Sequence, residues 1–434
     1  MNTYDELARS GIQLKTAIPG PIGTAQIQEN LGFQSPSLIH VYPLMVARAA
    51  GCMVEDVDGN VFLDAQAGVA AACTGHAHPE LVEAISKQAA TLIHICGTDF
   101  HYPGYGQLCR RLEQHARALE AKVGRDVSDP APRWQAFLTN SGTEAVEAAI
   151  KLARHHTGRS QLIAFRGGFH GRSMGSLSLT ASKTKYRRRF GPLLPGVHHA
   201  DYGSVASIVE QLFGHTVAPD DVAAIVVEPV LGEGGYIVPD VSFLKGLRAL
   251  CDQHGILLVF DEVQTGMGRT GTMFAAEHFG VVPDIFTLAK GLGSGMPIGA
   301  MLARTPTMTW GHGTHGSTCG GNPVAIAAAL STLDLLEHNL LDNCKHVGSY
   351  LQVRLQSELA RLPQVREVRG LGLMIGVEFD SGARADAIAE TCYKRGLLVL
   401  GCGERCIRIS PPLILSSVQA DWIADVFCSV VKAS

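Results

Sequence analysis

Long uninterrupted apolar runs are missing from this sequence of 434 residues. A membrane-spanning helix needs about eighteen consecutive apolar residues, so we expect no membrane span. The N-terminus also lacks the basic and then apolar pattern of a secretory signal. The eleven cysteines are scattered and odd in number, without the dense spacing of a disulfide framework. These absences predict a cytoplasmic protein that keeps its thiols reduced.

Charge is also scarce, because charged residues make up 18% of the chain and the net charge is −4. No basic block is large enough to indicate a nucleic-acid surface. The densest basic segment, Lys183 to Arg189, is interpreted as a solvated face, with an anion-binding role as the less favoured alternative. Paired histidines such as His76 and His78 have no cysteine or carboxylate partners at a ligand spacing, so we predict no metal site. Internal repeats and low-complexity tracts are absent.

From Trp134 onward, short apolar runs alternate with helical patterns or loops. This alternation is typical of a largely parallel sheet that is covered on both faces. The length of the chain favours roughly two to three domains. The apolar runs are QAFLTN, LIAFRG, AAIVVEP, ILLVFDE, IFTLAK and IGAMLA. Sites in such sheets lie beyond the carboxyl ends of the strands, and five polar side chains fall near these ends: Asn140, Arg166, Glu228, Asp261 and Lys290.

The remaining elements are predicted from turn residues and apolar periodicity. We expect a hairpin over residues 53–64, with Asp58 and Gly59 in its turn, and a first segment of forty residues that wraps over another surface. Helices are predicted over 80–91, 106–123, 323–338, 345–361 and 418–431, and further strands within 365–379 and 406–410. The predicted division is an N-terminal segment 1–65 belonging to a small domain, a large domain 66–330, and a C-terminal small domain 331–434.

Lys290 and Asp261 each close an apolar run, and twenty-nine residues separate them. A lysine and an aspartate at neighbouring strand ends can meet at one edge of a parallel sheet. Pyridoxal phosphate (PLP) enzymes require this pair, an amine for a Schiff base and a carboxylate for the pyridinium nitrogen. On spacing alone, a surface salt bridge between two ordinary strand ends is an equal alternative.

Two neighbouring motifs favour the cofactor interpretation. Ser141-Gly142-Thr143 stands where a strand passes into a helix, and helix N-termini bind phosphate. Ser141 and Glu144 also fit the spacing of a capping box, so an ordinary N-cap is the alternative. In GGFHGRS, Phe169 could stack on a planar ring and Arg172 could hold a carboxylate, although an isolated Phe is more often core. The segment GMGRTG (266–271) matches a dinucleotide-binding fingerprint. It does not directly follow the strand, and no acidic residue stands about twenty residues further on at the end of a second strand, so we reject this interpretation.

These motifs together resemble the class III PLP aminotransferases, and the resemblance extends from about Pro43 to the C-terminus. It is carried by LTNSGTEAVEAAIKLAR, GGFHGRS, VVEPVLGEGGY, LLVFDEVQTGMGRTG, IFTLAKGLGSGMPIGA, HGSTCGGNPVA, VRGLGLMIGVEF and GLLVLGCGERCIRISPPL. The resemblance implies an α/β, aspartate-aminotransferase-like fold (fold type I), with a mostly parallel seven-stranded type of sheet in a large domain and a small α+β domain. Within the family, the chain is most similar to 4-aminobutyrate (GABA) aminotransferases.

The resemblance also implies roles for individual residues. Lys290 would hold PLP and move the proton, Asp261 would face the ring nitrogen, and Gln264 would reach the phenolic oxygen. Phe169 and Val263 would cover the two ring faces, with His170 also at the cofactor. The phosphate would be held by Ser141, Gly142 and Thr143, and by Thr318 of a neighbouring subunit, which implies a homodimer and leaves a dimer of dimers open.

For the substrates, small amino and keto acids, the resemblance implies three charged residues. Arg172 would hold the distal carboxylate of the donor, Arg408 the α-carboxylate of 2-oxoglutarate, and Glu233 would pair with Arg408 when no α-carboxylate is present. The expected reaction moves the amino group of a GABA-like ω-amino acid to 2-oxoglutarate, giving a semialdehyde and glutamate. An acetylornithine, ornithine or lysine aminotransferase, an amino-acid racemase of the same family, and a catalytically silent PLP-fold protein are the alternatives.

Overall fold

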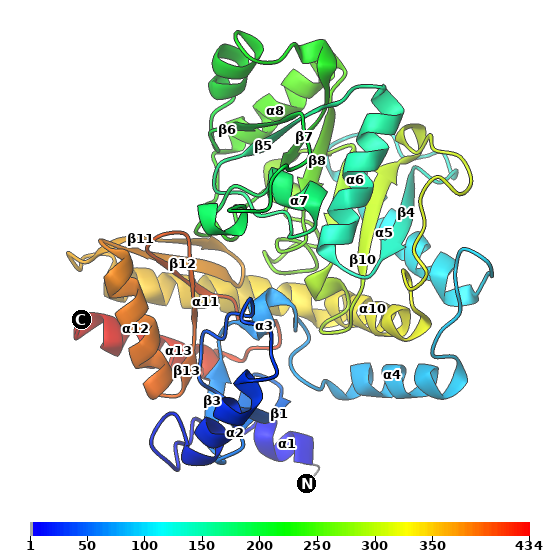
Figure 1. Ribbon diagram of the computed structural model, residues 1–434. Helices are drawn as coiled ribbons and strands as arrows, with labels where there is room; N and C mark the ends of the chain where they lie inside the picture. The colour runs from blue at the N-terminus through cyan, green and yellow to red at the C-terminus, as the bar shows by residue number, and fades with distance from the viewer. Residues whose placement is uncertain (1–2) are drawn as a thin grey trace.

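A seven-stranded β-sheet forms the centre of the structure, a computed structural model that describes residues 3–434 (Figure 1). Its strand order is β4-β10-β9-β8-β7-β5-β6. The strands are β4 Trp134–Thr139, β5 Gln161–Phe165, β6 Val197–Ala200, β7 Val222–Val227, β8 Leu257–Asp261, β9 Ile285–Leu288 and β10 Gly299–Arg304. All pairs are parallel except those of β10, which runs antiparallel to both neighbours. The mostly parallel sheet predicted from the six apolar runs is therefore confirmed.

Helices pack on both faces of this sheet, because successive residues of each strand point to opposite sides. In β8, Leu258 and Phe260 belong to one apolar core, whereas Leu257 and Val259 belong to another. Helix α8 (Val241–His254) packs in the first core, and α6 (Gly142–Thr157) packs in the second (Figure 1). Burial on both faces explains why the central strands read as continuous apolar runs rather than as alternating ones.

Two smaller sheets accompany the central one, and the first of them joins segments from both ends of the chain. The first contains β1 Val46–Ala50, β2 Met53–Asp56, β3 Val61–Asp64 and β13 Leu397–Leu398, and β13 lies parallel to β3. The second contains β11 Val365–Leu371, β12 Met374–Phe379, β14 Leu400–Cys402 and β15 Cys406–Ile409, covered by α11 (Leu341–Leu359) and α12 (Gly382–Lys394). Helix α13 (Ser417–Lys432) packs on these two helices. The predicted hairpin is confirmed as β2–β3. The predicted domain boundaries stay predictions.

The predicted helices over 80–91 and 106–123 are present as α4 (Pro79–Thr91) and α5 (Pro103–Lys122). The forty N-terminal residues contain α1 (Thr3–Ala8) and α2 (Pro21–Leu31), and Gln13 bridges to Val61 at the edge of β3.

One prediction about the C-terminal helices was wrong. Helices 323–338 and 345–361 were expected as separate elements, but the chain stays helical from Pro323 to Leu359 through α10 (Pro323–Leu335), a π-helical turn (Leu336–Leu340) and α11 (Leu341–Leu359). The wider turn keeps Leu336 and Leu340 buried across a polar stretch. By length and composition this helix could cross a membrane, but 56% of its apolar window is buried inside the protein, as in a core helix.

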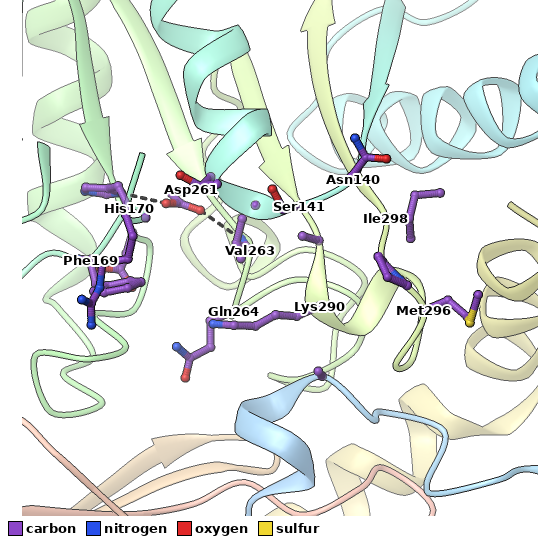
Figure 2. Close-up of a pocket in the computed structure, with 18 of the residues that line it drawn as sticks. Asn140, Ser141, Phe169, His170, Asp261, Val263, Gln264, Lys290, Met296 and Ile298 are labelled. Carbon is purple, nitrogen blue, oxygen red and sulfur yellow. Dashed lines mark hydrogen bonds and ion pairs between the residues drawn. The ribbon is translucent and has the colours of Figure 1, made fainter. Parts of the chain in front are cut away.

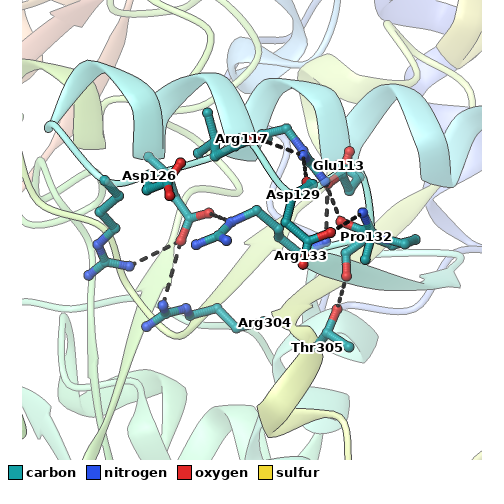
Figure 3. Close-up of polar contacts among 12 residues, drawn as sticks. Glu113, Arg117, Asp126, Asp129, Pro132, Arg133, Arg304 and Thr305 are labelled. Atoms are coloured by element: carbon teal, nitrogen blue, oxygen red, sulfur yellow. Dashed lines mark hydrogen bonds and ion pairs between the residues drawn. The ribbon is translucent and has the colours of Figure 1, made fainter.

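A buried carboxylate anchors the connector between α5 and β4, which leads the chain toward the site (Figure 3). Glu120 accepts hydrogen bonds from Arg133 Nε at 2.6 Å and from Arg125 at 3.1 Å, and Arg304 lies 3.6 Å away. Burial would raise the pKa of Glu120, but these arginines outweigh it and lower the pKa. Arg117 adds hydrogen bonds to the connector carbonyls, including that of Asp129 at 2.6 Å. The start of β4 is therefore held by paired charges, which would be costly to bury singly.

Candidate active site

A cavity of about 410 Å³ lies beyond the carboxyl ends of the central strands (Figure 2). Its walls come from the β4–α6 turn, the loop after β5, and the segments that follow β8 and β9. The cavity is lined by every residue that was predicted to contact PLP except Thr318: Ser141, Gly142, Thr143, Phe169, His170, Asp261, Val263, Gln264 and Lys290. Arg172 also lines it.

Lys290 follows β9 and begins a short 3₁₀ turn, Lys290–Leu292. Its backbone has φ = +43°, in the left-handed region that non-glycine residues rarely adopt. Such strain persists only where the surroundings enforce it, and it clusters at functional sites. Burial lowers the pKa of the Lys290 amine, and the positive charge of Arg408 acts in the same direction against the opposing effect of Glu233. The neutral amine, which is the form that attacks a carbonyl carbon, is therefore easier to reach here than in a solvated lysine.

Asp261 ends β8 and is held in one orientation by three hydrogen bonds. One carboxylate oxygen contacts His170 Nδ1 at 2.7 Å, and the other accepts from the Thr287 hydroxyl at 2.9 Å and the Val263 N–H at 3.1 Å (Figure 2). Asp261 is 3% exposed. Burial would lower the pKa of His170, but the hydrogen bond and charge of Asp261 raise it overall. An anchored carboxylate of this kind suits the protonated nitrogen of a ring.

The N-terminus of α6 supplies backbone N–H groups to the cavity. Ser141 is the N-cap, and its hydroxyl accepts from the Glu144 N–H at 3.3 Å. The capping box suggested by the spacing is only half formed, because Glu144 accepts from the Asn140 N–H at 2.6 Å rather than from Ser141. The Thr143 hydroxyl is engaged at 2.6 Å by the hydroxyls of Ser173 and Ser176. The first N–H groups of a helix lack intrahelical acceptors, so those of Gly142 and Thr143 suit an anion.

Close packing requires glycine at the start of α6. A Cβ atom on Gly142 would lie 2.8 Å from Val263 Cγ1, a distance that carbon atoms do not tolerate. The side chain of Val263 therefore packs directly against the first turn of the helix. Even an alanine at position 142 would displace Val263 from the cavity.

Glu228 also lines this cavity, although no motif in the sequence assigns it a role. It follows β7, and its carboxylate accepts from the N–H groups of Phe169 and Gly232, both at 2.9 Å. Burial raises its pKa to about 7. Glu228 thus fixes the loop that carries Phe169. Its position after the apolar run AAIVV, matching that of Asp261 after its own run, was the signal that could have identified it.

Glu233 and Arg408 form an ion pair next to the cavity without lining it. Arg408 lies on β15 and is 4% exposed, and its partner side chain is 16% exposed. Burial would raise the pKa of Glu233, but Arg408 outweighs it and lowers the pKa, with Lys290 and Lys183 acting in the same direction. The two residues that the resemblance assigns to a substrate switch are therefore in contact, with the carboxylate charged.

Thr318 is exposed and does not line the cavity of its own chain. This position is compatible with the predicted use of Thr318 by a neighbouring subunit, which stays a prediction. All eleven cysteines are free thiols. Within residues 3–434, histidines, cysteines and acidic residues form no group that could hold a metal ion.

With this geometry in place, comparison with known proteins assigns the family. The model of the class III aminotransferases ("Aminotransferase class-III") matches residues 35–431, so the chain belongs to that family. The acetylornithine aminotransferase of Methanopyrus kandleri is 42% identical over 397 residues, which is 91% of this chain and 95% of the relative. The acetylornithine aminotransferase of Methanothermobacter thermautotrophicus is 40% identical over 392 residues, 90% of this chain and 94% of the relative.

Solved structures agree with this assignment. The ornithine aminotransferase of Toxoplasma gondii ME49 has a TM-score of 0.84 at 31% identity, covering 95% of both chains. The omega transaminase of Pseudomonas jessenii, in complex with PMP, has a TM-score of 0.84 at 26% identity, covering 94% of this chain and 97% of that one. The fold is therefore the aspartate-aminotransferase-like fold type I, as predicted, and the cofactor of the family is PLP.

The residues of the cavity fit this cofactor. Gln264 Oε1 is buried and has no hydrogen-bond partner within the described chain, so it needs a polar group from a ligand. The amine of Lys290, the carboxylate of Asp261 and the helix N-terminus at Ser141 line the same cavity. They match the aldehyde, the ring nitrogen and the phosphate of PLP, respectively. The assignment of each contact stays a prediction.

Proposed function

We propose that this chain transfers the terminal amino group of an ornithine-type donor, N-acetylornithine or ornithine, to 2-oxoglutarate. The names of the relatives support this choice of donor over GABA. The observation that carries the proposal is the placement of two arginines, Arg172 at the cavity and Arg408 paired with Glu233 beside it. Two carboxylate sites suit a reaction in which one partner is a dicarboxylate.

Each residue has a defined task in this proposal. When bound, PLP supplies an aldehyde that accepts the amino group and a ring that withdraws electrons from the carbon that loses its proton. Lys290 Nζ takes that proton and returns it to the neighbouring position, since its pKa is lowered by burial. Asp261 keeps the ring nitrogen protonated, and Arg172 holds the donor carboxylate with its planar fork.

Glu233 resolves the difference between the two substrates. A donor that binds through its terminal amine brings no carboxylate to Arg408, and a buried unpaired cation is costly. Glu233 neutralises Arg408 in that half of the reaction and leaves it when the α-carboxylate of 2-oxoglutarate binds. GABA fits this scheme too, because it lacks an α-carboxylate, and it is the second candidate donor. We further propose a cytoplasmic homodimer, in which Thr318 completes the phosphate site of the partner.

A panel of half-reactions tests the donor. The PLP-loaded protein is mixed with one amine at a time, and the loss of cofactor absorbance is followed. N-acetylornithine or ornithine should react with a higher kcat/KM than GABA, and the reverse order would establish GABA as the donor. A racemase would instead consume the optical activity of an amino acid supplied alone, without forming a keto acid.

The Lys290→Ala variant tests catalysis itself. It should lose the absorbance of covalently held cofactor and all transamination, because no other amine lines the cavity in the part of the chain that the structure describes. A variant that still turned over at the wild-type rate would refute the role of Lys290. A wild-type protein that never acquired the absorbance would indicate a silent binding protein.

A further inference from the structure

Tyr186 is in direct contact with Arg172 through its aromatic ring. The Arg172 Cζ atom lies 3.7 Å from the centre of the Tyr186 ring, and 5.6 Å from the ring of Phe169. Tyr186 ends a 3₁₀ turn, Thr184–Tyr186, within the basic segment 183–189, and it is 9% exposed. The ring is therefore a buried platform, while the guanidinium group on it belongs to an exposed residue.

Within residues 3–434, Arg172 forms no salt bridge, and its guanidinium group lies against the two aromatic rings instead. A cation over the face of an aromatic ring gains about 0.5–1 kcal/mol at an exposed site. A guanidinium group stacked by its face keeps the N–H groups on its edge available, and these are the groups that bind a carboxylate in a fork. Stacking on Tyr186 thus favours one rotamer of Arg172 and leaves the N–H groups at the edge of its guanidinium group free to bind a carboxylate.

Tyr186 is itself fixed by the cavity wall. Its ring meets that of Phe169 edge to face, with centres 5.8 Å apart and planes at 81°. The Phe169 N–H donates to buried Glu228 at 2.9 Å. The Tyr186 N–H donates to the Lys183 carbonyl at 3.1 Å. A continuous series of contacts therefore runs from the cavity to the guanidinium group.

We propose that Tyr186 is the positioning residue of Arg172, and that it sets the preference for donors with a carboxylate remote from the reacting amine. This inference rests on the proposed function only for the identity of the donor. Tyr186 does not line the cavity, so it acts through the arginine that it contacts. The basic segment that was interpreted as a solvated face thereby gains a role in the site.

The variants Tyr186→Leu and Tyr186→Phe distinguish a role in positioning Arg172 from a structural role that would affect all substrates. Tyr186→Leu should raise KM for N-acetylornithine about two- to fivefold, the loss expected for one exposed cation–π contact, with kcat unchanged. KM for 1,5-diaminopentane, which has no carboxylate, should stay at the wild-type value. Tyr186→Phe keeps the aromatic ring, so its KM for N-acetylornithine should equal that of the wild type. Lys185→Ala is the matched control, since Lys185 Nζ lies 5.6 Å from the same ring but outside the cavity.

Calorimetric titration with glutarate, an unreactive dicarboxylate, gives a readout without turnover. Tyr186→Leu should weaken glutarate binding in the wild-type background and have no further effect in Arg172→Ala, because coupled residues are not additive. Equal weakening in both backgrounds, or an equal rise in KM for the diamine, would overturn the inference. If no tested donor reacts, the proposed function fails while the glutarate cycle still decides the role of Tyr186.

Discussion

Replacing Glu233 with glutamine should shift the enzyme toward its keto-acid half-reaction. Glu233 is charged and paired with buried Arg408, so in the proposed reaction it competes with the α-carboxylate of 2-oxoglutarate for the same guanidinium group. Glutamine preserves the size of the side chain and one hydrogen-bond acceptor, but it removes the charge. The competitor for Arg408 is weakened, and the substrate carboxylate binds more tightly.

The size of the shift follows from the kind of hydrogen bond that is lost. Arg408 keeps its charge in the variant, so an ion pair becomes a hydrogen bond with only one charged partner. Hydrogen bonds to charged groups contribute about 1.5–3 kcal/mol, and a move from the strong to the weak end of this range, up to roughly 1.5 kcal/mol, corresponds to a KM for 2-oxoglutarate that is lower by up to about tenfold. The donor half-reaction should slow by a similar factor, because Arg408 then stays without a counter-charge while a donor without an α-carboxylate is bound.

Stopped-flow absorbance of the cofactor measures each half-reaction separately. Glu404→Gln is the matched control, because Glu404 is an exposed carboxylate in the turn between β14 and β15, on the hairpin that carries Arg408. It should leave both halves unchanged. If Glu233→Gln slowed both halves equally, a role in folding would explain the residue, and the competition for Arg408 would be refuted.

Two further predictions concern substrate binding and stability. Arg172→Ala should raise KM for N-acetylornithine and GABA far more than for α-alanine, which has no distal carboxylate, and unchanged steady-state kinetics with both ω-donors would remove the donor assignment. Glu262 is fully buried, and burial raises its pKa from 4.5 to about 7. Its contribution to stability is therefore complete below pH 4.5 and is lost as the pH rises toward 7, at most roughly 3 kcal/mol. The Tm of the wild type should fall over this pH range relative to the Tm of Glu262→Gln, and parallel curves of Tm against pH would contradict the shift.

The sequence predicted those parts of the site that depend on strand ends. Asp261 and Lys290 close short apolar runs of the length of buried strands, and parallel strands bring their carboxyl ends to one edge. The turn at Ser141 and Gly142 was also predictable, because it is encoded by residues that are neighbours in the sequence. Strand β6, by contrast, was not predicted, because its sequence VHHA is short, polar and half-exposed at the edge of the sheet.

Other features depend on contacts between distant segments, which local patterns do not encode. The π-helical turn at residues 336–340 looked like the end of a helix, because polar residues interrupt the apolar period there. The half-formed capping box depends on Glu144 reaching Asn140, four residues before it, instead of Ser141, three residues before it, and the sequence alone does not decide between the two. The stacking of Arg172 on Tyr186 joins two loops whose approach follows from the fold.

The three cations around the cavity show how burial decides which of them needs a partner. Arg172 is exposed, so water solvates its charge, and an aromatic ring suffices to orient it. Lys290 is enclosed by the cavity, and burial lowers the pKa of its amine, because a low-dielectric site disfavours the charged form. Arg408 cannot lose its proton and is nearly fully buried, so it alone requires a carboxylate. In the proposed reaction, a substrate therefore displaces Glu233 by bringing a carboxylate of its own, and we expect the second half-reaction to require the α-carboxylate.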